Sequence, residues 1–208
     1  AAERVTGIAG IVNGTTNFIL SKMADEGQEY EDVLKEAQRL GYAEANPSAD
    51  VDGFDSTYKL SILSSLAFHT KVPVDKIYRE GISRISKEDI AYGKRFGYTL
   101  KLLAIAKRVN GKIEARVHPA FIPDTHPLAS VKGSFNAVHI VGDNVGDIML
   151  YGRGAGDLPT GSAIVSDIVF ASQQKKHKYM PFKNSNDVSD KNFAKDFFHN
   201  GSPPFCLM

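Results

Sequence analysis

The sequence predicts an α+β domain with a mixed, largely antiparallel open sheet and helices packed on one face of it. Three observations support this prediction. Residues 14–95 carry apolar side chains at intervals of three and four, which is the period of amphipathic helices. Residues 98–152 carry β-branched and apolar runs separated by short turns, as antiparallel strands do. A β-branched run at residues 5–13 precedes both parts and adds a first strand.

The composition is that of an ordinary globular protein, with 42% hydrophobic and 24% charged residues. A net charge of +1 gives no long-range field that would favour nucleic acid or an acidic membrane surface. No apolar run approaches the ~20 residues of a membrane-spanning helix. The single cysteine, Cys206, excludes a disulfide within the chain and indicates a reducing cytoplasm.

Local signals place the first strand and helix. The glycine-punctuated run "VTGIAGIVN", residues 5–13, predicts a buried strand. Thr15 or Thr16 is then expected to cap a helix, because a hydroxyl can accept a hydrogen bond from the first free amides. Gly27 is expected to end that helix, because glycine readily adopts the left-handed conformation of a C-terminal cap.

Four more helical or connecting segments follow. The amphipathic pattern of residues 29–42 predicts a second helix with Gly41 at its C-terminal end. Residues 45–53, "ANPSADVDG", contain turn-forming residues and should be a loop. Residues 53–68 predict a long, mostly buried helix, and residues 72–82 predict a connector.

A shorter helix and four strands complete the domain. The helix begins after Ser86, which forms a near capping-box pattern with Asp89. Asn-Gly-Lys at 110–112 is a strong hairpin signal, and "NVGD" at 144–147 joins the last two strands. A glycine-rich loop then leads into a closing helix within residues 153–174. The predicted strands are Tyr98–Val109, Lys112–Ile122, Phe135–Asp143 and Gly146–Gly152.

We expect residues 1–172 to form the folded domain and residues 173–208 to form a linker or tail. The tail begins with the basic run Lys175–Lys178 and continues without a sustained period. A solvated linker explains the basic run better than nucleic-acid binding, because no aromatic platform accompanies it. One short helix is expected near Phe193–Phe198. The start in an apolar strand without a methionine suggests a segment of a longer protein.

Residues 44–59, "EANPSADVDGFDSTYK", gather four carboxylates before a single ammonium. A calcium-binding loop that began at Ser48 would have Lys59 at its twelfth position, where EF-hand sites need a bidentate glutamate. A second interpretation is a solvated acidic turn, since Asp52 or Asp55 would interact well with a helix N-terminus. That interpretation leaves the lysine unexplained.

A polar pocket is the third interpretation of the carboxylate cluster. Asp55 and Lys59 are four residues apart, so they lie one turn apart on one helix face. That face should look toward the preceding loop, with Glu44 and Asp50 within reach. Carboxylates suit recognition of a cationic amine, and a partly desolvated lysine suits proton transfer at an alcohol or carbonyl oxygen. Such a pocket would take an amino acid that bears a hydroxyl or an aldehyde.

Several segments share one order with a known family. They are "GIVNGTTNFIL", "EAQRLGYAEANPSADVDGFDSTYKL", "RVHPAFIP" and "HPLASVKGSFNAVHIVGDNVGDIMLYGRGAGDLPTGSAIVSDI". Together they resemble the homoserine dehydrogenase family over roughly Val5–Ile168. The second segment resembles the family signature, although Asn46 stands where an aspartate is common.

The resemblance implies an NAD(P)-dependent oxidoreductase that interconverts L-homoserine and L-aspartate 4-semialdehyde in threonine, methionine and isoleucine biosynthesis. It implies two catalytic residues. Lys59 would give and take the proton at the substrate oxygen, and Asp55 would lie near the substrate amino group. It also implies that Glu44 binds the substrate, that Asp50 assists it, and that the backbone of Gly41 approaches it.

The resemblance also bears on the cofactor and the partners. Thr15 and Thr16, at a helix start, would offer amide donors to the substrate carboxylate. Gly154 and Gly156 match the loop that closes against the nicotinamide cofactor. The chain has no G-x-G-x-x-G turn, so we expect the dinucleotide to bind mainly to a domain absent from it. The chain alone should therefore be inactive. The family implies a cytoplasmic homodimer, and residues 173–208 would lead toward a truncated ACT domain, which some members carry.

A different class of function stays open at this point, namely a non-catalytic module for oligomerisation or amino-acid sensing. Lys59 distinguishes the two classes, because a sensor needs carboxylates for the amine but no ammonium at a reacting oxygen. No metal site is expected. His118 and His126 lie eight residues apart and have no Cys or His partner at ligand spacing.

Overall fold

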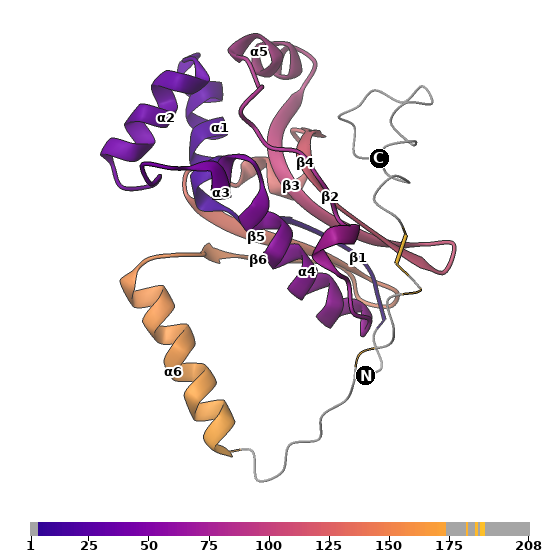
Figure 1. Cartoon of the computed structure of the whole chain (residues 1–208). Coiled ribbons are helices and arrows are strands. Elements are labelled where there is room, and N and C mark those ends of the chain that lie inside the picture. Colours follow the sequence, from indigo (N-terminus) through magenta and orange to yellow (C-terminus); the bar gives the residue numbers. More distant parts are fainter. Residues whose placement is uncertain (1–3, 174–181, 183–185, 187, 190–208) are drawn as a thin grey trace.

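Figure 1 shows the computed structural model, which describes residues 4–173 together with residues 182, 186, 188 and 189. The predicted linker or tail therefore lies almost entirely outside the described residues. The same holds for the helix expected near Phe193–Phe198 and for the expected approach to an ACT domain.

A six-stranded sheet has the order β2-β4-β3-β1-β5-β6. Neighbouring strands are antiparallel except β2 and β4, which run in parallel. This confirms the predicted mixed, largely antiparallel open sheet. The strands are β1 (Val5–Ile11), β2 (Tyr78–Arg79), β3 (Tyr98–Val109), β4 (Lys112–Pro123), β5 (Phe135–Gly142) and β6 (Gly146–Arg153).

The long β3–β4 hairpin forms where the Asn-Gly pair predicted it. Asn110 and Gly111 both have positive φ values, 49° and 81°, as a two-residue turn of this kind requires. Val109 pairs with Lys112 on the two sides of the turn, and the pairing continues to Tyr98. The turn therefore sets the register that places each strand residue on one face or the other.

Helices cover one face of the sheet, as predicted (Figure 1). On that face Leu102 and Ala104 of β3 pack in one hydrophobic core with Ile19, Val33 and Leu60 from three different helices. These side chains are almost completely removed from solvent, and their burial is the main favourable term in folding. The helices are α1 (Gly14–Glu26), α2 (Tyr30–Arg39), α3 (Ser48–Val51), α4 (Phe54–Phe68) and α5 (Lys87–Arg95).

A smaller core occupies the opposite face. There Leu103 and Ile105 of β3 pack with Ile122 of β4 and with Leu128 of the 3₁₀ turn η2 (Pro127–Ser130). Because alternate residues of β3 enter different cores, the strand is apolar on both faces. This explains its nearly continuous apolar sequence.

The ends of the first helix were predicted only in part. Its N-terminal cap is Asn13, whose side chain accepts a hydrogen bond from the Thr16 amide, so the expected cap at Thr15 or Thr16 is wrong. Its C-terminal cap is Gly27 with a φ of 67°, as expected. The correction matters, because it moves the polar cap residue to the end of β1.

Three short elements and one exposed face differ from the predictions. The expected loop at 45–53 contains α3, and the expected connector at 72–82 contains η1 (Val74–Lys76) and β2. Elements of two to four residues carry too few side chains for a periodic pattern. The fourth helix is less buried than predicted, because one stripe faces solvent. This stripe, called the α4 stripe below, consists of Phe54, Tyr58, Ile62 and Leu66.

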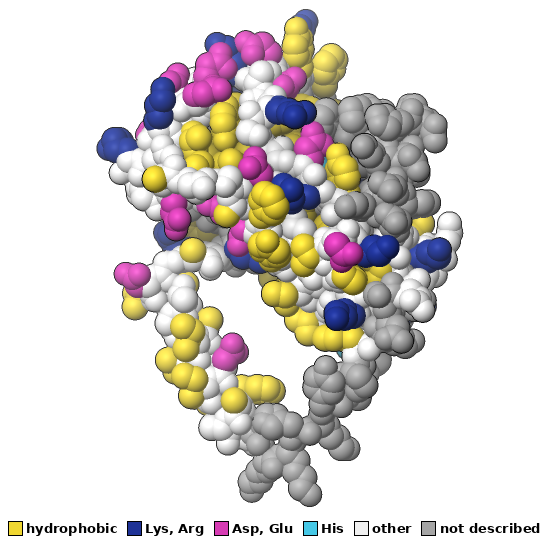
Figure 2. Space-filling model, in the orientation of Figure 1, with side chains coloured by type: hydrophobic (Ala, Val, Ile, Leu, Met, Phe, Trp, Pro, Cys, Tyr) yellow, Lys and Arg dark blue, Asp and Glu magenta, His cyan; other side chains and the backbone are white. Residues whose placement is uncertain are grey.

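The last helix, α6 (Asp157–Gln173), extends away from the sheet, and its side chains are exposed (Figure 1). Apolar side chains run along it in the space-filling view of Figure 2. They include Ile164, Ile168 and Phe170, each more than half exposed. Within the described part of the chain, no helix has the length and apolar character needed to cross a membrane.

Candidate active site

A cavity of ≈ 420 Å³ lies where the start of α1, the end of α2 and the α3–α4 segment meet the loop after β6. Polar and charged side chains enter it from α1 and α4, and backbone enters it from the glycine-rich loop. Residues far apart in the sequence therefore share one wall. The cavity is lined by Asn13, Gly14, Thr15, Gly41, Tyr42, Asp50, Asp55, Lys59, Ser134, Asn136, Arg153, Gly154, Ala155 and Gly156.

Asn13 joins the two carboxylates of the cavity. Its side-chain oxygen caps α1 by accepting from the Thr16 amide at 2.9 Å. Its Nδ2 donates to Asp50 Oδ1 at 2.6 Å and to Asp55 Oδ2 at 2.9 Å. One buried amide thus uses its oxygen for the helix and both hydrogens for the acids, which holds two like charges close together.

Lys59 completes the network on α4. Its Nζ donates to Asp55 Oδ2 at 2.7 Å and to the backbone oxygen of Val12 at 3.0 Å. An ammonium has three N–H donors, so one is left for a substrate oxygen. The side chains of Lys59 and Asp55 are 45% and 31% exposed, so a small molecule can reach the pair.

The rim of the cavity is built by the turn that follows α2. The Thr15 hydroxyl donates to the backbone oxygen of Tyr42 at 2.6 Å, which ties this turn to the start of α1. Gly41 has a φ of 78°, so it supplies the left-handed residue that ends the helix. The ring of Tyr42 packs on Phe18 with centroids 4.6 Å apart.

The opposite wall comes from β5 and the loop after β6. Gly14 packs so tightly on Ser134 that an added Cβ would lie 2.8 Å from the Ser134 oxygen. A Cβ on Gly154 would collide with the Asn136 side-chain amide, so a larger residue there would require the loop or Asn136 to move. Gly156 has a φ of 117°, a conformation that side chains strongly disfavour.

The structure brings most of the predicted site residues together and separates two of them. Glu44 is exposed and is not among the residues that line the cavity. Thr16 is buried beside the cavity, and its amide is already bonded to Asn13. The roles assigned to all nine residues stay predictions. Those that line the cavity are Thr15, Gly41, Asp50, Asp55, Lys59, Gly154 and Gly156.

The lining residues that the sequence reasoning missed include Asn13, Ser134, Asn136 and Arg153. Asn13 carried a usable signal, because asparagine directly before a helix is a preferred cap. The other three had no signal, since only the folding of β5 and β6 beside α1 brings them to the cavity.

The arrangement suits an amino acid with a reactive oxygen. Two carboxylates favour a cationic amine, and the adjacent ammonium can exchange a proton with an oxygen at the reacting carbon. No group of three His, Cys, Asp or Glu side chains that could hold a metal ion occurs among the described residues.

Comparisons with known proteins agree on one family. The family model described as homoserine dehydrogenase matches residues 1–169. The chain is 52% identical to a homoserine dehydrogenase of Bacillus subtilis over 169 residues, which are 81% of this chain and 39% of that protein. It is 50% identical to one of Corynebacterium glutamicum over 182 residues, which are 85% of this chain and 41% of that protein.

Solved structures are similar in fold as well. A homoserine dehydrogenase from Thiobacillus denitrificans has a TM-score of 0.83 at 46% identity, covering 91% of this chain and 45% of that one. A hyperthermophilic archaeal homoserine dehydrogenase in complex with NADPH has a TM-score of 0.69 at 31% identity, covering 87% and 50%. The chain spans well under half of the length of the curated relatives named above.

Proposed function

Because the chain belongs to the homoserine dehydrogenase family, we propose that it forms the substrate-binding catalytic domain of such an enzyme. The whole enzyme would interconvert L-homoserine and L-aspartate 4-semialdehyde with NAD(P), as a cytoplasmic oxidoreductase of amino-acid biosynthesis. The observation that carries the proposal is the cavity in which Asn13 joins Asp50 to the Asp55–Lys59 pair. The comparisons do not favour a non-catalytic sensing module.

The acids of the cavity would hold the substrate amine. Asp50 and Asp55 carry two negative charges, while Lys59 supplies one positive charge in the network. The remaining negative charge complements the ammonium of an α-amino acid. Fixing that end of a four-carbon substrate would place its hydroxyl or aldehyde toward Lys59, which is catalysis by positioning.

Lys59 would handle the proton at the substrate oxygen. Oxidation of the alcohol removes its hydroxyl proton, and reduction of the aldehyde returns one. The Asp55 carboxylate and the Val12 oxygen hold Lys59 Nζ in place through two hydrogen bonds. Those contacts leave one N–H of the ammonium for the substrate oxygen in the cavity.

A bound nicotinamide would accept or donate the hydride at the substrate carbon. The residues of this chain fit only one side of that group. The Gly154–Gly156 segment has no side chain except the methyl group of Ala155, and it borders the cavity that contains Lys59. The chain has no G-x-G-x-x-G turn for a pyrophosphate. We therefore propose that another part of the parent protein holds most of the dinucleotide.

Lys59→Ala in the full-length enzyme tests the proposed function. Loss of a positioned acid–base group costs ~10²- to 10⁴-fold in rate, so we expect kcat to fall by at least ~100-fold. The KM for homoserine should stay within several-fold, because Asp50 and Asp55 remain. Lys35→Ala is the matched control, since the Lys35 side chain is 75% exposed and its one ion pair with a described residue is to Asp32. Unchanged turnover of Lys59→Ala would remove the basis of the proposal.

The isolated 208-residue chain should show no dehydrogenase activity. It supplies the substrate side of the cavity but no phosphate-binding turn for the cofactor. Purified chain is assayed with homoserine and with NAD or NADP over a range of concentrations. Measurable turnover that vanished in Lys59→Ala would show that the chain binds the whole cofactor itself.

We further propose that the enzyme is a homodimer. Exposed apolar surface supports this, because large apolar patches on a soluble protein usually mark contacts. The edge strand β6 presents Ile148, Met149, Leu150 and Tyr151 with substantial exposure. An uncovered edge strand of this kind is a template for pairing with another strand.

A further inference from the structure

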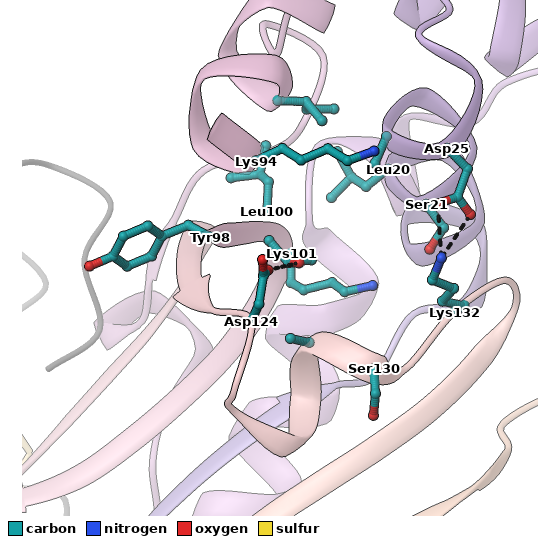
Figure 3. Close-up of a pocket in the computed structure, with 14 residues that line it drawn as sticks. Leu20, Ser21, Asp25, Lys94, Tyr98, Leu100, Lys101, Asp124, Ser130 and Lys132 are labelled. Atoms are coloured by element: carbon teal, nitrogen blue, oxygen red, sulfur yellow. Dashed lines mark hydrogen bonds and ion pairs between the residues drawn. The ribbon is translucent and has the colours of Figure 1, made fainter. Parts of the chain in front are cut away.

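Lys101 is a buried lysine outside the candidate active site. It lies on β3, is only 2% exposed, and borders a second cavity of ≈ 290 Å³ between α1, α5 and η2 (Figure 3). Its Nζ donates to Asn17 Oδ1 at 2.9 Å and to the Val131 oxygen at 2.6 Å. Among the described residues it has no carboxylate within ion-pair distance. A buried lysine without a counter-charge is costly, so its position needs a reason.

Asn17, on α1, is the centre of the contacts around Lys101. It is 2% exposed. Its Nδ2 lies within hydrogen-bond distance of the backbone oxygens of every second residue from 131 to 135. The distances are 3.2 Å to Val131, 2.9 Å to Gly133 and 3.1 Å to Phe135. Asn17 and Lys101 thus fasten the 131–135 segment to α1 from within the protein.

The fastened segment leads directly into the wall of the active-site cavity. Ser134 lies within it and Asn136 follows it, and both line the cavity. Ser134 packs on Gly14, and Asn136 packs on Gly154 of the glycine-rich loop. The Asn136 Oδ1 atom is buried and has no hydrogen-bond partner within the described residues, so its acceptor remains for a ligand donor.

We propose that Asn17 and Lys101 are positioning residues that set the distance between the two walls of the active-site cavity. One wall carries Asn13 at the start of α1, and the other carries Ser134 and Asn136. Asn17 is one helical turn after Asn13, so both walls are attached to the same helix, α1. The inference rests on the proposed function, because it assigns these residues to the geometry of that same site.

The chemistry of the two residues fits this task better than a plain core contact. The Asn17 oxygen accepts a hydrogen bond from Lys101, while the two hydrogens of its amide nitrogen are shared among the three carbonyl oxygens. The Lys101 amine needs only two hydrogens for its two acceptors, so the contacts survive loss of its proton. Lys132 and Asp25 are the charged groups that act on the Lys101 amine electrostatically, and they form an ion pair with each other at 2.9 Å.

Asn17→Asp in the full-length enzyme is the sharpest test. The change keeps the size and an acceptor for Lys101, but it removes the donor and sets an oxygen against three carbonyls. We expect the KM for homoserine to rise about tenfold, the order seen when outer-shell partners of a site are lost. The kcat should change less than about threefold, because Lys59 and Asp55 are untouched. Asn144→Asp, the same change in the exposed β5–β6 turn, is the control.

Lys101→Met tests the second residue, and it provides an independent variant if Asn17→Asp does not fold. Its control is Lys107→Met on the same strand, a half-buried lysine whose nearest charges are Arg116 and Glu114. Hydrogen exchange of the amides at 131–136 is measured on the 208-residue chain below its melting temperature. Exchange should be about tenfold faster in Asn17→Asp and Lys101→Met and unchanged in both controls.

The results separate this inference from the proposed function. Wild-type KM and wild-type exchange at 131–136 in both variants would overturn the positioning role, even if Lys59→Ala abolished turnover. A Lys59→Ala enzyme with full turnover would instead overturn the proposed function, and faster exchange at 131–136 would still show that the two residues hold the segment. A tenfold loss of kcat with unchanged KM would also contradict the inference.

Discussion

At the scale of single residues, Asn13 explains how two carboxylates share a cavity. The carboxylates of Asp50 and Asp55 would repel each other if no hydrogen-bond donor lay between them. The Asn13 amide donates to both, and Lys59 adds a positive charge to Asp55. Hydrogen bonds to a charged acceptor are worth about 1.5–3 kcal/mol each, so this one side chain has a large effect on the site.

Asn13→Asp separates that role from helix capping. Aspartate caps helices as well as asparagine does, so the cap of α1 is kept. It places a third acid between two others and removes both donors. We expect kcat/KM to fall by about 100-fold, the cost of roughly 3 kcal/mol in transition-state binding. Asn13→Ser, which caps without adding charge, should lose less. Equal activity of wild type and Asn13→Asp would show that the bridge is unimportant.

Lys101 predicts a pH dependence of stability. Burial lowers the pKa of Lys101 from 10.5 to about 8. The unfolded chain therefore binds more protons than the folded chain between about pH 8 and pH 10.5, and the free energy of unfolding rises with pH in that window. The rise amounts to at most about 3 kcal/mol. Urea unfolding of wild type and Lys101→Met at pH 8 and pH 10 measures it. The same slope in both proteins would contradict the assignment.

Residue patterns alone could predict the Asp55–Lys59 pair but not its partners. A spacing of four on a helix fixes their mutual position, so the pair follows from the sequence. The cap at Asn13 was missed, because the adjacent threonines compete for the same preference. Lys101 was missed because its burial depends on α1 crossing the end of β3, which no local pattern contains.

At the scale of elements, long periodic segments were predicted well and short ones poorly. The four strands from Tyr98 onward agree with the structure to within one residue at each end, because their turns and alternation are both strong. β2 has only two residues, so its pairing with β4 is invisible in the sequence. α4 is less buried than predicted, because apolar composition does not show which apolar face of a helix packs on the rest of the protein.

Gly154→Ala tests how the loop after β6 depends on β5. An added Cβ would collide with the Asn136 amide, so either the loop or Asn136 must move. We expect the KM for the nicotinamide cofactor to rise about tenfold. Gly152→Ala is the matched control, since nothing lies within 4 Å of its added Cβ. The double variant Gly154→Ala/Asn136→Ala should recover part of the loss. No rescue would indicate that the glycine matters for another reason, and no loss in the single variant would contradict the packing argument.

At the scale of the whole molecule, most of the exposed large apolar side chains of the described residues lie on three elements. They lie on the α4 stripe and on β6. They also run along α6 (Figure 2). Leaving such surface in water costs roughly 25 cal/mol per Å², which favours its coverage by protein. The chain spans less than half of its curated relatives, so part of this surface is available to the remainder of the parent protein. A second copy is the proposed partner for β6.

The edge position of β6 makes the dimer testable in the 208-residue chain. Among the described residues β6 pairs only with β5, and a twofold axis perpendicular to β6 would join it to the β6 of a second copy as antiparallel edge strands. Leu150 is 61% exposed on this strand, and a lysine there would place two like charges across the axis. We expect Leu150→Lys to weaken dimerisation at least about tenfold, measured by sedimentation equilibrium. Val74→Lys, an exposed position beside the opposite sheet edge at β2, should dimerise like wild type. A Leu150→Lys chain that dimerised as strongly as wild type would rule out β6 pairing and leave the α4 stripe or α6 as the contact.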